Sequence, residues 1–316
     1  MSDPRAALTA VQAEVAKAVH GQDHVIWGLT AALLLRGHVI LEGVPGVAKT
    51  LTVKALAGAL DLQFRRIQFT PDLMPSDVTG NLVYEGADAG FRFRPGPIFA
   101  NLVLADELNR TPPKTQAAML EAMEERQVSV EGEARPLPNP FIVVATQNPI
   151  EYEGTYPLPE AELDRFLFKL RVGYPEPAEE RKVLKLHDRG IDPHDLRALG
   201  VTPVASAADL QEGAAGVTAV RVADGIIDYV AALARETRTS PSLTLGVSPR
   251  GAAMLLRAAK AWAWLSGNDF VTPDDVKALL KPTWRHRLIL RPEVELEGAK
   301  ADSVLDALAE RVPVPA

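Results

Sequence analysis

The chain has 316 residues, enough for about two domains at one per roughly 150 residues. Hydrophobic residues make up 47% and charged residues 24%, which argues against global disorder and fibrous repeats. A net charge of −7 argues against a protein that coats nucleic acid, and the lack of cysteine excludes disulfides, thiolate metal sites and cysteine nucleophiles. No apolar run approaches the roughly 18 residues of a membrane helix, and the N-terminus lacks a signal pattern, so we expect a cytoplasmic protein without a membrane span.

The first half of the chain alternates short β-rich runs with helical patterns, which is typical of a parallel sheet covered by helices. Helices are expected at about residues 5–19, 22–36, 49–60 and 113–126, and strands at 38–41, 64–69, 102–105, 141–146 and 166–172. Three of these strands are almost continuously apolar, so both sheet faces should be covered there. The strand at 64–69 contains Arg65, Arg66 and Gln68, which favours a place nearer an edge.

Two insertions and a change of composition complete the expected organisation. Each insertion has two short strands around a turn-rich segment, at residues 82–93 and at 128–137. After Pro175 the chain becomes Ala-rich, with helices expected at about 178–189, 207–212, 222–238, 249–266 and 273–280, and a further short helix within 299–312. We therefore predict an α/β domain over residues 1–174 and a helical domain over residues 175–316.

A phosphate-binding loop is predicted between the first strand and the helix that begins near Lys49. Small residues allow successive backbone N–H groups to surround phosphate oxygens, and the helix N-terminus adds partial positive charge. Lys49 can reach the β- and γ-phosphates of a nucleotide, and the Thr50 hydroxyl can coordinate Mg²⁺. Ala48 stands where the common pattern has glycine; if this position is already helical, alanine fits without a positive φ. The loop and its helix contribute the candidate contacts Gly43, Val44, Pro45, Gly46, Val47, Ala48, Lys49, Thr50 and Leu51.

Two carboxylates follow the apolar strand at 102–105. Adjacent residues on a strand point to opposite sides, so Asp106 and Glu107 can have different roles. Asp106 could hold Mg²⁺, and Glu107 could polarise an attacking water as a general base. The alternative, a solvated acidic strand end, becomes weak when a phosphate-binding loop lies upstream.

Three further polar residues complete the predicted site. Asn148 follows a strand and could orient water without adding charge, although Asn-Pro is also a common turn start. Arg165 precedes the last strand, where the alternative is a structural ion pair with Glu162 or Asp164. Arg250 lies in the first turn of a helix, where the dipole disfavours a cation, so a nearby anion such as phosphate is expected; a surface arginine is the alternative.

Taken together, these sequence motifs resemble those of the AAA+ ATPases, and they closely resemble those of the MoxR family. The resemblance rests on residues 41–50, 105–110, 145–149 and 158–166, and extends from about Gln22 to Arg287. Alanine at position 48 is common in MoxR proteins. The implied fold is an AAA+ P-loop NTPase with a five-stranded parallel sheet and a C-terminal all-α lid domain.

The resemblance also implies roles. Asp106 would be the Walker B metal residue, Glu107 the catalytic glutamate and Asn148 sensor 1. Arg165 would be an arginine finger that reaches a neighbouring nucleotide, and Arg250 would be sensor 2, on a lid that closes against bound γ-phosphate. Gln22 would line the adenine pocket.

The implied cofactors are ATP and Mg²⁺, and the implied assembly is a homo-oligomeric ring, usually a hexamer, with the two hairpins at the pore or on one face. The implied function is ATP-driven remodelling, maturation or metal insertion in a partner protein or complex, often with a von Willebrand factor A domain protein. A metal-chelatase or gas-vesicle AAA+ motor remains an alternative, and a DNA-directed motor is disfavoured because the second hairpin has Glu131 and Glu133 against one Arg135.

Overall fold

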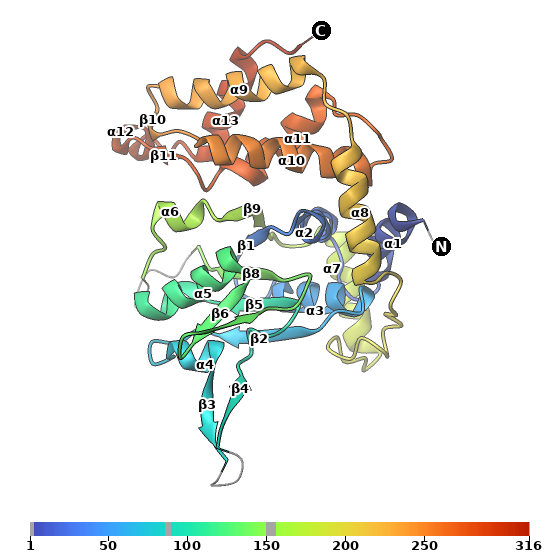
Figure 1. The fold of residues 1–316 in the computed structure, drawn as a ribbon. Coiled ribbons are helices and arrows are strands. Elements are labelled where there is room, and N and C mark those ends of the chain that lie inside the picture. The colour runs from blue at the N-terminus through green and yellow to red at the C-terminus, as the bar shows by residue number, and fades with distance from the viewer. Residues whose placement is uncertain (1–2, 86–89, 150–155, 316) are drawn as a thin grey trace.

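The computed structural model describes residues 3–85, 90–149 and 156–315, and its centre is a five-stranded parallel sheet (Figure 1). The strand order is β2-β5-β8-β1-β9, so the polar strand β2 lies at an edge, as its sequence predicts. The strands are β1 (His38–Glu42), β2 (Phe64–Gln68), β5 (Leu102–Asp106), β8 (Ile142–Gln147) and β9 (Phe166–Arg171). All neighbouring strands are parallel, so the carboxyl ends of the strands lie together at one end of the sheet, which we call the carboxyl edge; the amino edge is the other end.

Helices cover both faces of the sheet because successive strand side chains point in opposite directions. Val39 and Leu41 pack in one buried cluster, with α2 and α3, whereas Ile40 packs in a second cluster with α5. The helices of this part are α1 (Pro4–Val15), α2 (Asp23–Leu35), α3 (Lys49–Ala59), α4 (Pro75–Thr79), α5 (Pro113–Glu125) and α6 (Glu160–Leu163), with a 3₁₀ turn η1 (Leu108–Arg110).

Both predicted hairpins are confirmed. The first pairs β3 (Gly80–Tyr84) with β4 (Phe91–Pro95), and it projects from the body of the molecule (Figure 1). Of its expected turn, residues 86–89 lie outside the described part of the chain. The second hairpin pairs β6 (Gln127–Val130) with β7 (Glu133–Pro136).

The C-terminal part is helical, with one short addition. Its helices are α7 (Pro177–Asp188), α8 (Ala207–Ala219), α9 (Asp224–Thr239), α10 (Pro249–Leu265), α11 (Pro273–Trp284), α12 (Pro292–Leu296) and α13 (Ala301–Arg311). The addition is an antiparallel pair, β10 (Leu243–Leu245) with β11 (Ile289–Leu290), which an all-α lid does not anticipate. Helix α8 continues beyond the predicted end, through Gly213 and Gly216, because both glycines pack closely against Trp264.

One apolar core runs from the sheet into the helical lid. The same buried cluster contains Leu41 of β1 and Leu255 and Trp284 of the lid. Trp27 of α2 and Trp262 of α10 meet edge to face, with ring centroids 4.3 Å apart. Within the described residues, no helix is both long and apolar enough to cross a membrane.

Candidate functional site

The predicted phosphate-binding loop joins the carboxyl end of β1 to the start of α3. The backbone N–H of Gly43 donates to the Gln147 carbonyl at 3.1 Å, which anchors the loop to β8. A Cβ at Gly43 would lie 2.4 Å from the Val172 carbonyl oxygen, so only glycine fits there. Gly46 has a φ of +85° and open space around its Cα, so the reason for glycine at this position is conformational.

Ala48 is left-handed, not helical. Its φ of 61° and ψ of 23° place it at the N-cap of α3, so the expectation that alanine fits without a positive φ is wrong. An alanine in this conformation costs about 1 kcal/mol. Its carbonyl nevertheless accepts the Thr52 backbone N–H at 2.9 Å, so Ala48 both turns the loop and begins the helix.

The first turn of α3 supplies the polar side chains of the loop. Lys49 and Thr50 are its first two residues, followed by the buried Leu51. The Lys49 ammonium donates a hydrogen bond to the Gly43 carbonyl, and so lies back over the loop. The backbone N–H groups of a first turn have no intrahelical acceptor, which makes this end of α3 a cradle for an anion.

Asp106 ends β5 at the same edge of the sheet. Its Oδ1 accepts a hydrogen bond from the Thr146 hydroxyl at 2.6 Å, and its Oδ2 accepts from Arg66 Nε and Nη2 at 2.9 and 2.6 Å. Arg66 comes from the edge strand β2, which pairs with β5. The carboxylate is therefore held in one orientation from both neighbouring strands.

Glu107 lies beyond the end of β5. The prediction that Asp106 and Glu107 point to opposite sides because both lie on a strand therefore had the wrong reason. Its φ of 59° and ψ of 46° make it the left-handed N-cap of η1, and this turn separates its side chain from that of Asp106. Its carboxylate accepts from Gln68 Nε2 at 2.6 Å and pairs with Arg110 at 3.3 Å.

Arg66, Gln68 and Thr146 were not among the predicted site residues. The sequence contained a signal for two of them, because Arg66 and Gln68 are two apart on a strand and so share one side. The strand order then places that side beside Asp106 and Glu107.

Gln22 and Asn148 also lie near the carboxyl edge. Asn148 directly follows β8, between the strands that end in Asp106 and in Glu42. Gln22 is 3% exposed and donates to the Gly173 carbonyl at 2.9 Å, close to where Val172 packs on Gly43. The Gln22 Oε1 atom is buried and has no hydrogen-bond partner, so it is available to a ligand that donates.

Arg165 lies at the amino edge of the sheet, at the other end of the strands from the phosphate-binding loop. It directly precedes β9, whose first residue Phe166 pairs with His38 at the amino end of β1. Its guanidinium contacts Glu124 at 3.0 Å and Glu162 at 3.2 Å, so the ion pair with Glu162 considered from the sequence is present.

Arg250 lies with Arg165 and not with the phosphate-binding loop. Its Nη1 is 3.4 Å from the same Glu124, near the end of α5. The neighbouring Met123 carbonyl bonds His38 Nε2 at 3.0 Å, which fixes this end of α5 at the amino edge of the sheet. A lid arginine that closes on the phosphate-binding loop of its own subunit is therefore not what the fold presents.

Buried charges at the two edges are neutralised in different ways. Burial raises the pKa of Glu42, but Lys169 and Arg171 outweigh it and hold that pKa below its usual range. Burial lowers the pKa of His38 to about 4, so this imidazole is neutral near pH 7.

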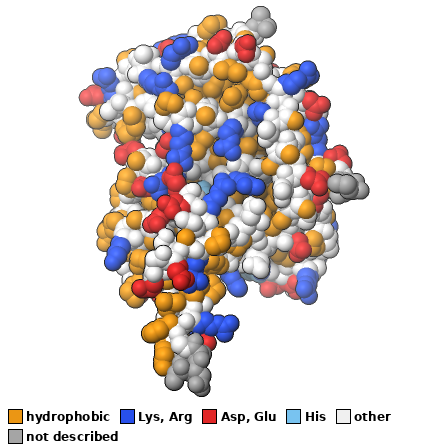
Figure 2. All heavy atoms as spheres, viewed as in Figure 1, with side chains coloured by type: hydrophobic (Ala, Val, Ile, Leu, Met, Phe, Trp, Pro, Cys, Tyr) orange, Lys and Arg blue, Asp and Glu red, His pale blue; other side chains and the backbone are white. Residues whose placement is uncertain are grey.

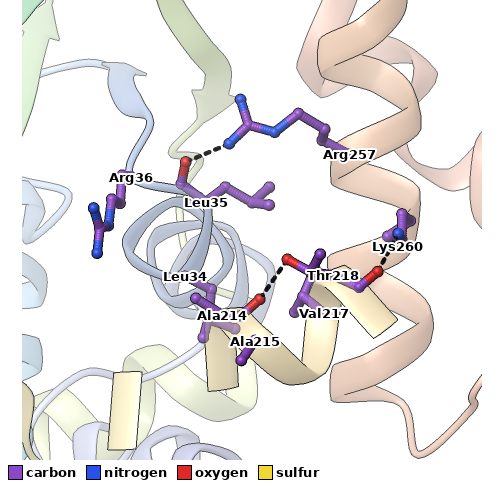
Figure 3. A pocket seen from close by; sticks show the side chains of 9 residues that line it. All are labelled: Leu34, Leu35, Arg36, Ala214, Ala215, Val217, Thr218, Arg257 and Lys260. Carbon is purple, nitrogen blue, oxygen red and sulfur yellow. Dashed lines mark hydrogen bonds between the residues drawn. The ribbon is translucent and has the colours of Figure 1, made fainter. Parts of the chain in front are cut away.

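A basic recess of about 450 Å³ lies between α2, α8 and α10 (Figure 3). Arg257 donates to the Leu35 carbonyl at 2.8 Å and Lys260 to the Thr218 carbonyl at 2.6 Å. Both carbonyls belong to the last turn of a helix, where cations are favoured. These cations therefore have a structural role, and no residue of the phosphate-binding loop lines the recess.

Comparisons with known proteins address the whole chain. Residues 38–168 match the model of the ATPase family associated with various cellular activities (AAA), and residues 235–308 match an AAA lid domain. Chaperone MoxR1 of Mycobacterium tuberculosis is 42% identical, with 96% of this chain and 81% of that protein covered. Protein MoxR of Methylorubrum extorquens is 34% identical, over 100% of this chain and 97% of that protein.

The chain belongs to the MoxR family of AAA+ ATPases. An uncharacterised relative, YeaC of Bacillus subtilis, is 52% identical over 90% of this chain and 88% of its own length. A crystal structure from Cytophaga hutchinsonii, of a protein provisionally described as an ATPase, superposes with a TM-score of 0.91 at 38% identity, covering 99% of this chain and 96% of that one.

The MoxR assignment agrees with the fold and covers both groups of candidate residues. The AAA match contains the phosphate-binding loop, Asp106, Glu107 and Arg165, and the lid match contains Arg250. The α/β fold with a C-terminal lid, predicted from the sequence, is therefore confirmed.

Proposed function

We propose that this MoxR protein hydrolyses ATP with Mg²⁺ at sites shared between neighbouring subunits of a homo-oligomeric ring, and uses the energy to remodel a partner protein. One observation carries the proposal: a phosphate cradle with two carboxylates occupies one edge of the sheet, and a pair of arginines occupies the opposite edge. Each subunit thus has two different half-sites.

The carboxyl edge has the features that MgATP needs. The loop from Gly43 to Ala48 would surround the phosphates with backbone N–H groups, and Lys49 would exchange the Gly43 carbonyl for a phosphate oxygen. Thr50 and Asp106 would hold Mg²⁺, which neutralises phosphate charge when it is bound. The unpartnered Gln22 Oε1 suits the exocyclic amine of adenine. Beside the cradle, Val44, Pro45, Val47 and Leu51 complete the loop and the first turn.

Hydrolysis requires a group that takes a proton from water. Glu107 has that role in our proposal, after release from Gln68 and Arg110, and Asn148 would orient the water. Thr146 joins the Asp106 carboxylate to the Glu107 backbone, because its hydroxyl donates to Asp106 Oδ1 and accepts the Glu107 backbone N–H at 3.0 Å. The Asp106 carboxylate is therefore tied to the backbone from which the Glu107 side chain extends.

The arginines would complete the site of a neighbour. Strand β1 has five residues, which separates the two edges by about 13 Å at about 3.3 Å per residue. Arg165 and Arg250 are therefore distant from their own cradle, and a head-to-tail contact would bring them to the next one. Such heterologous contacts form a ring when the rotation closes; we propose six subunits.

Several basic side chains, with acidic ones beside them, lie along the seam between the lid and the α/β part on the face in Figure 2. In a protein of net charge −7, these basic side chains would complement a nucleotide bound to a neighbour.

The client would be a protein that meets the β3–β4 hairpin. Tyr84 is 59% exposed and Phe91 is 71% exposed, and apolar side chains line this projection in Figure 2. Exposed apolar surface of this kind favours contact with protein. We propose a client complex that contains a von Willebrand factor A domain, with maturation or metal insertion as the outcome.

A motor of the metal-chelatase or gas-vesicle type is the second candidate, since the same hairpins would serve it. A DNA motor has less support, because Arg135 already pairs with Glu133 at 2.7 Å and stacks on Phe93 at 4.1 Å. Among the described residues 127–136 of the second hairpin, the single cation is therefore already paired and less available to a nucleic-acid strand.

The test compares wild type with Glu107→Gln, Arg165→Ala and Arg250→Ala by native mass and ATPase assays across protein concentration, with MgATP. We expect wild-type turnover per subunit to rise with concentration, because an arginine supplied by a partner adds on the order of 10³-fold or more. Glu107→Gln should form a stable ring without turnover, and both arginine variants should bind ATP but lose the rise. Equal turnover per subunit at nanomolar and micromolar concentration would contradict the proposal.

A further inference from the structure

Arg165 and Arg250 converge on the two oxygens of one carboxylate, that of Glu124. Arg165 Nε lies 3.0 Å from Glu124 Oε2, and Arg250 Nη1 lies 3.4 Å from Glu124 Oε1. The arginines come from a loop before β9 and from the lid helix α10, so the convergence is tertiary. All three side chains are partly exposed, Glu124 by 44%.

The backbone segments that carry the two arginines are joined to each other. Asp164, next to Arg165, accepts a hydrogen bond from Ser248 Oγ at 3.2 Å and pairs with the buried Arg287 at 2.8 Å. Ser248 is the N-cap of α10, two residues before Arg250. The lid and the loop before β9 are thus joined at Asp164, which fixes the backbones of both arginines relative to each other.

The carboxylate is equally well placed. Glu124 is the penultimate residue of α5, and His38 holds the preceding Met123 carbonyl at 3.0 Å. The next residue, Glu125, points elsewhere, since it accepts from Gln127 at 3.2 Å. One of two consecutive glutamates therefore meets the arginine pair.

We propose that Glu124 competes with phosphate for the two arginines. In a separate subunit Glu124 binds Arg165 and Arg250, and the γ-phosphate of the nucleotide bound to a neighbouring subunit displaces it. Guanidinium groups bind carboxylate and phosphate with the same planar donor geometry, so one can replace the other. This inference rests on the proposed function, because it assumes that both arginines act across the subunit interface.

The strength of the contacts suits reversible release. Exposed ion pairs are weak, and phosphate offers the arginines more negative charge than a carboxylate. Glu124 would therefore not prevent assembly; it would raise the subunit concentration at which assembly and turnover begin. Loss of its charge should lower that concentration by about two- to fivefold.

The experiment measures the concentration for half-maximal ATPase in wild type, Glu124→Gln and the control Glu125→Gln, which removes the same charge one residue away. Ring formation is followed separately by sedimentation with MgATP in the Glu107→Gln background, so that assembly is read without turnover. We expect Glu124→Gln to lower both midpoints by about two- to fivefold, with unchanged turnover at saturating protein. Glu125→Gln should match its parent, and Glu124→Ala should behave as Glu124→Gln.

Two results would overturn the inference. Unchanged midpoints in Glu124→Gln would show that the carboxylate does not compete. Reduced turnover at saturating protein would show that Glu124 supports the arginines in the assembled site. Failure of the proposed function looks different, because wild type itself would then show no dependence of turnover on concentration, and Glu107→Gln would form no ring.

Discussion

Arg66 donates two hydrogen bonds to a single oxygen of Asp106, at 2.9 and 2.6 Å. A cation thus lies against the carboxylate that we propose as a metal ligand. The same guanidinium also bonds Gln68 Oε1 at 2.6 Å, and Gln68 in turn bonds Glu107. Edge strand β2 therefore orients both carboxylates of the candidate site, although it contributes no residue to the phosphate cradle.

The first prediction concerns Arg66. Arg66→Ala should lower saturated turnover by about tenfold, because Asp106 loses one of its two orienting partners and interactions with charged groups contribute about 1.5 kcal/mol or more. The affinity for ATP, measured with a fluorescent nucleotide, should change little. Arg66→Lys should recover part of the turnover, and the neighbouring Arg65→Ala should resemble wild type. A loss of nucleotide affinity in step with turnover would point to a collapsed loop instead.

The second prediction concerns backbone strain at Ala48. Ala48→Gly should raise the free energy of unfolding by about 0.5–1 kcal/mol, because glycine adopts a φ of 61° without a Cβ clash. Ala48→Val should lower it, since branched side chains are the least tolerant of this conformation. Urea denaturation measures the free energy of unfolding of wild type and of both variants. Ala57→Gly, inside the same helix, should be destabilising, and an equal sign for both glycine variants would contradict the assignment.

The third prediction compares two glycines of the loop. Gly43→Ala should abolish detectable nucleotide binding, because its Cβ would lie 2.4 Å from the Val172 carbonyl, a contact that requires the loop to move. Gly46→Ala meets no neighbouring atom and should only add the cost of alanine at positive φ, about 1 kcal/mol. Isothermal titration with MgATP measures both. A larger loss of binding in Gly46→Ala than in Gly43→Ala would contradict the conclusion that close approach limits Gly43 and backbone conformation limits Gly46.

The fourth prediction concerns pH. Burial lowers the pKa of His38 from 6.5 to about 4, so the folded state resists a proton that the unfolded chain accepts. The contribution of His38 to stability is therefore complete above pH 6.5 and is lost as the pH falls toward 4, by about 3 kcal/mol in all.

The check for His38 is the slope of stability against pH. His38→Gln cannot titrate, so its free energy of unfolding should fall less steeply than that of wild type between pH 6.5 and 4, even if it is lower at pH 7. Carboxylates that titrate in this range affect both proteins alike. Parallel slopes would mean that His38 takes up its proton in the folded state as readily as in the unfolded chain.

Much of this molecule could be predicted from local sequence patterns. The strands, both hairpins, the edge position of β2 and the phosphate-binding loop follow from short runs of residues whose chemistry is read in sequence. The conformation of Ala48 could not be predicted in this way, because the closure of the loop onto α3 decides it. The full length of α8 was missed because Gly213 and Gly216 look like helix breakers until Trp264 is seen against them.

Glu124 marks the limit of what the sequence reveals. It lies among the acidic residues at the end of α5 and has the appearance of a solvated helix face. Its importance depends on Arg165 and Arg250, which are distant in the chain and meet it only through the packing of the lid on the sheet. Likewise, only the parallel strand order reveals that both arginines lie on the edge opposite Asp106.

The apolar core that continues from the sheet into the lid has a mechanical consequence. Swinging the lid away would separate Trp27 from Trp262 and expose side chains that are now fully covered, at about 25 cal/mol for each Å². The contacts of Asp164 with Ser248 and Arg287 oppose the same motion. A single copy is therefore expected to move as one rigid block, and in the proposed ring the flexible hinge would lie at the boundary between adjacent copies.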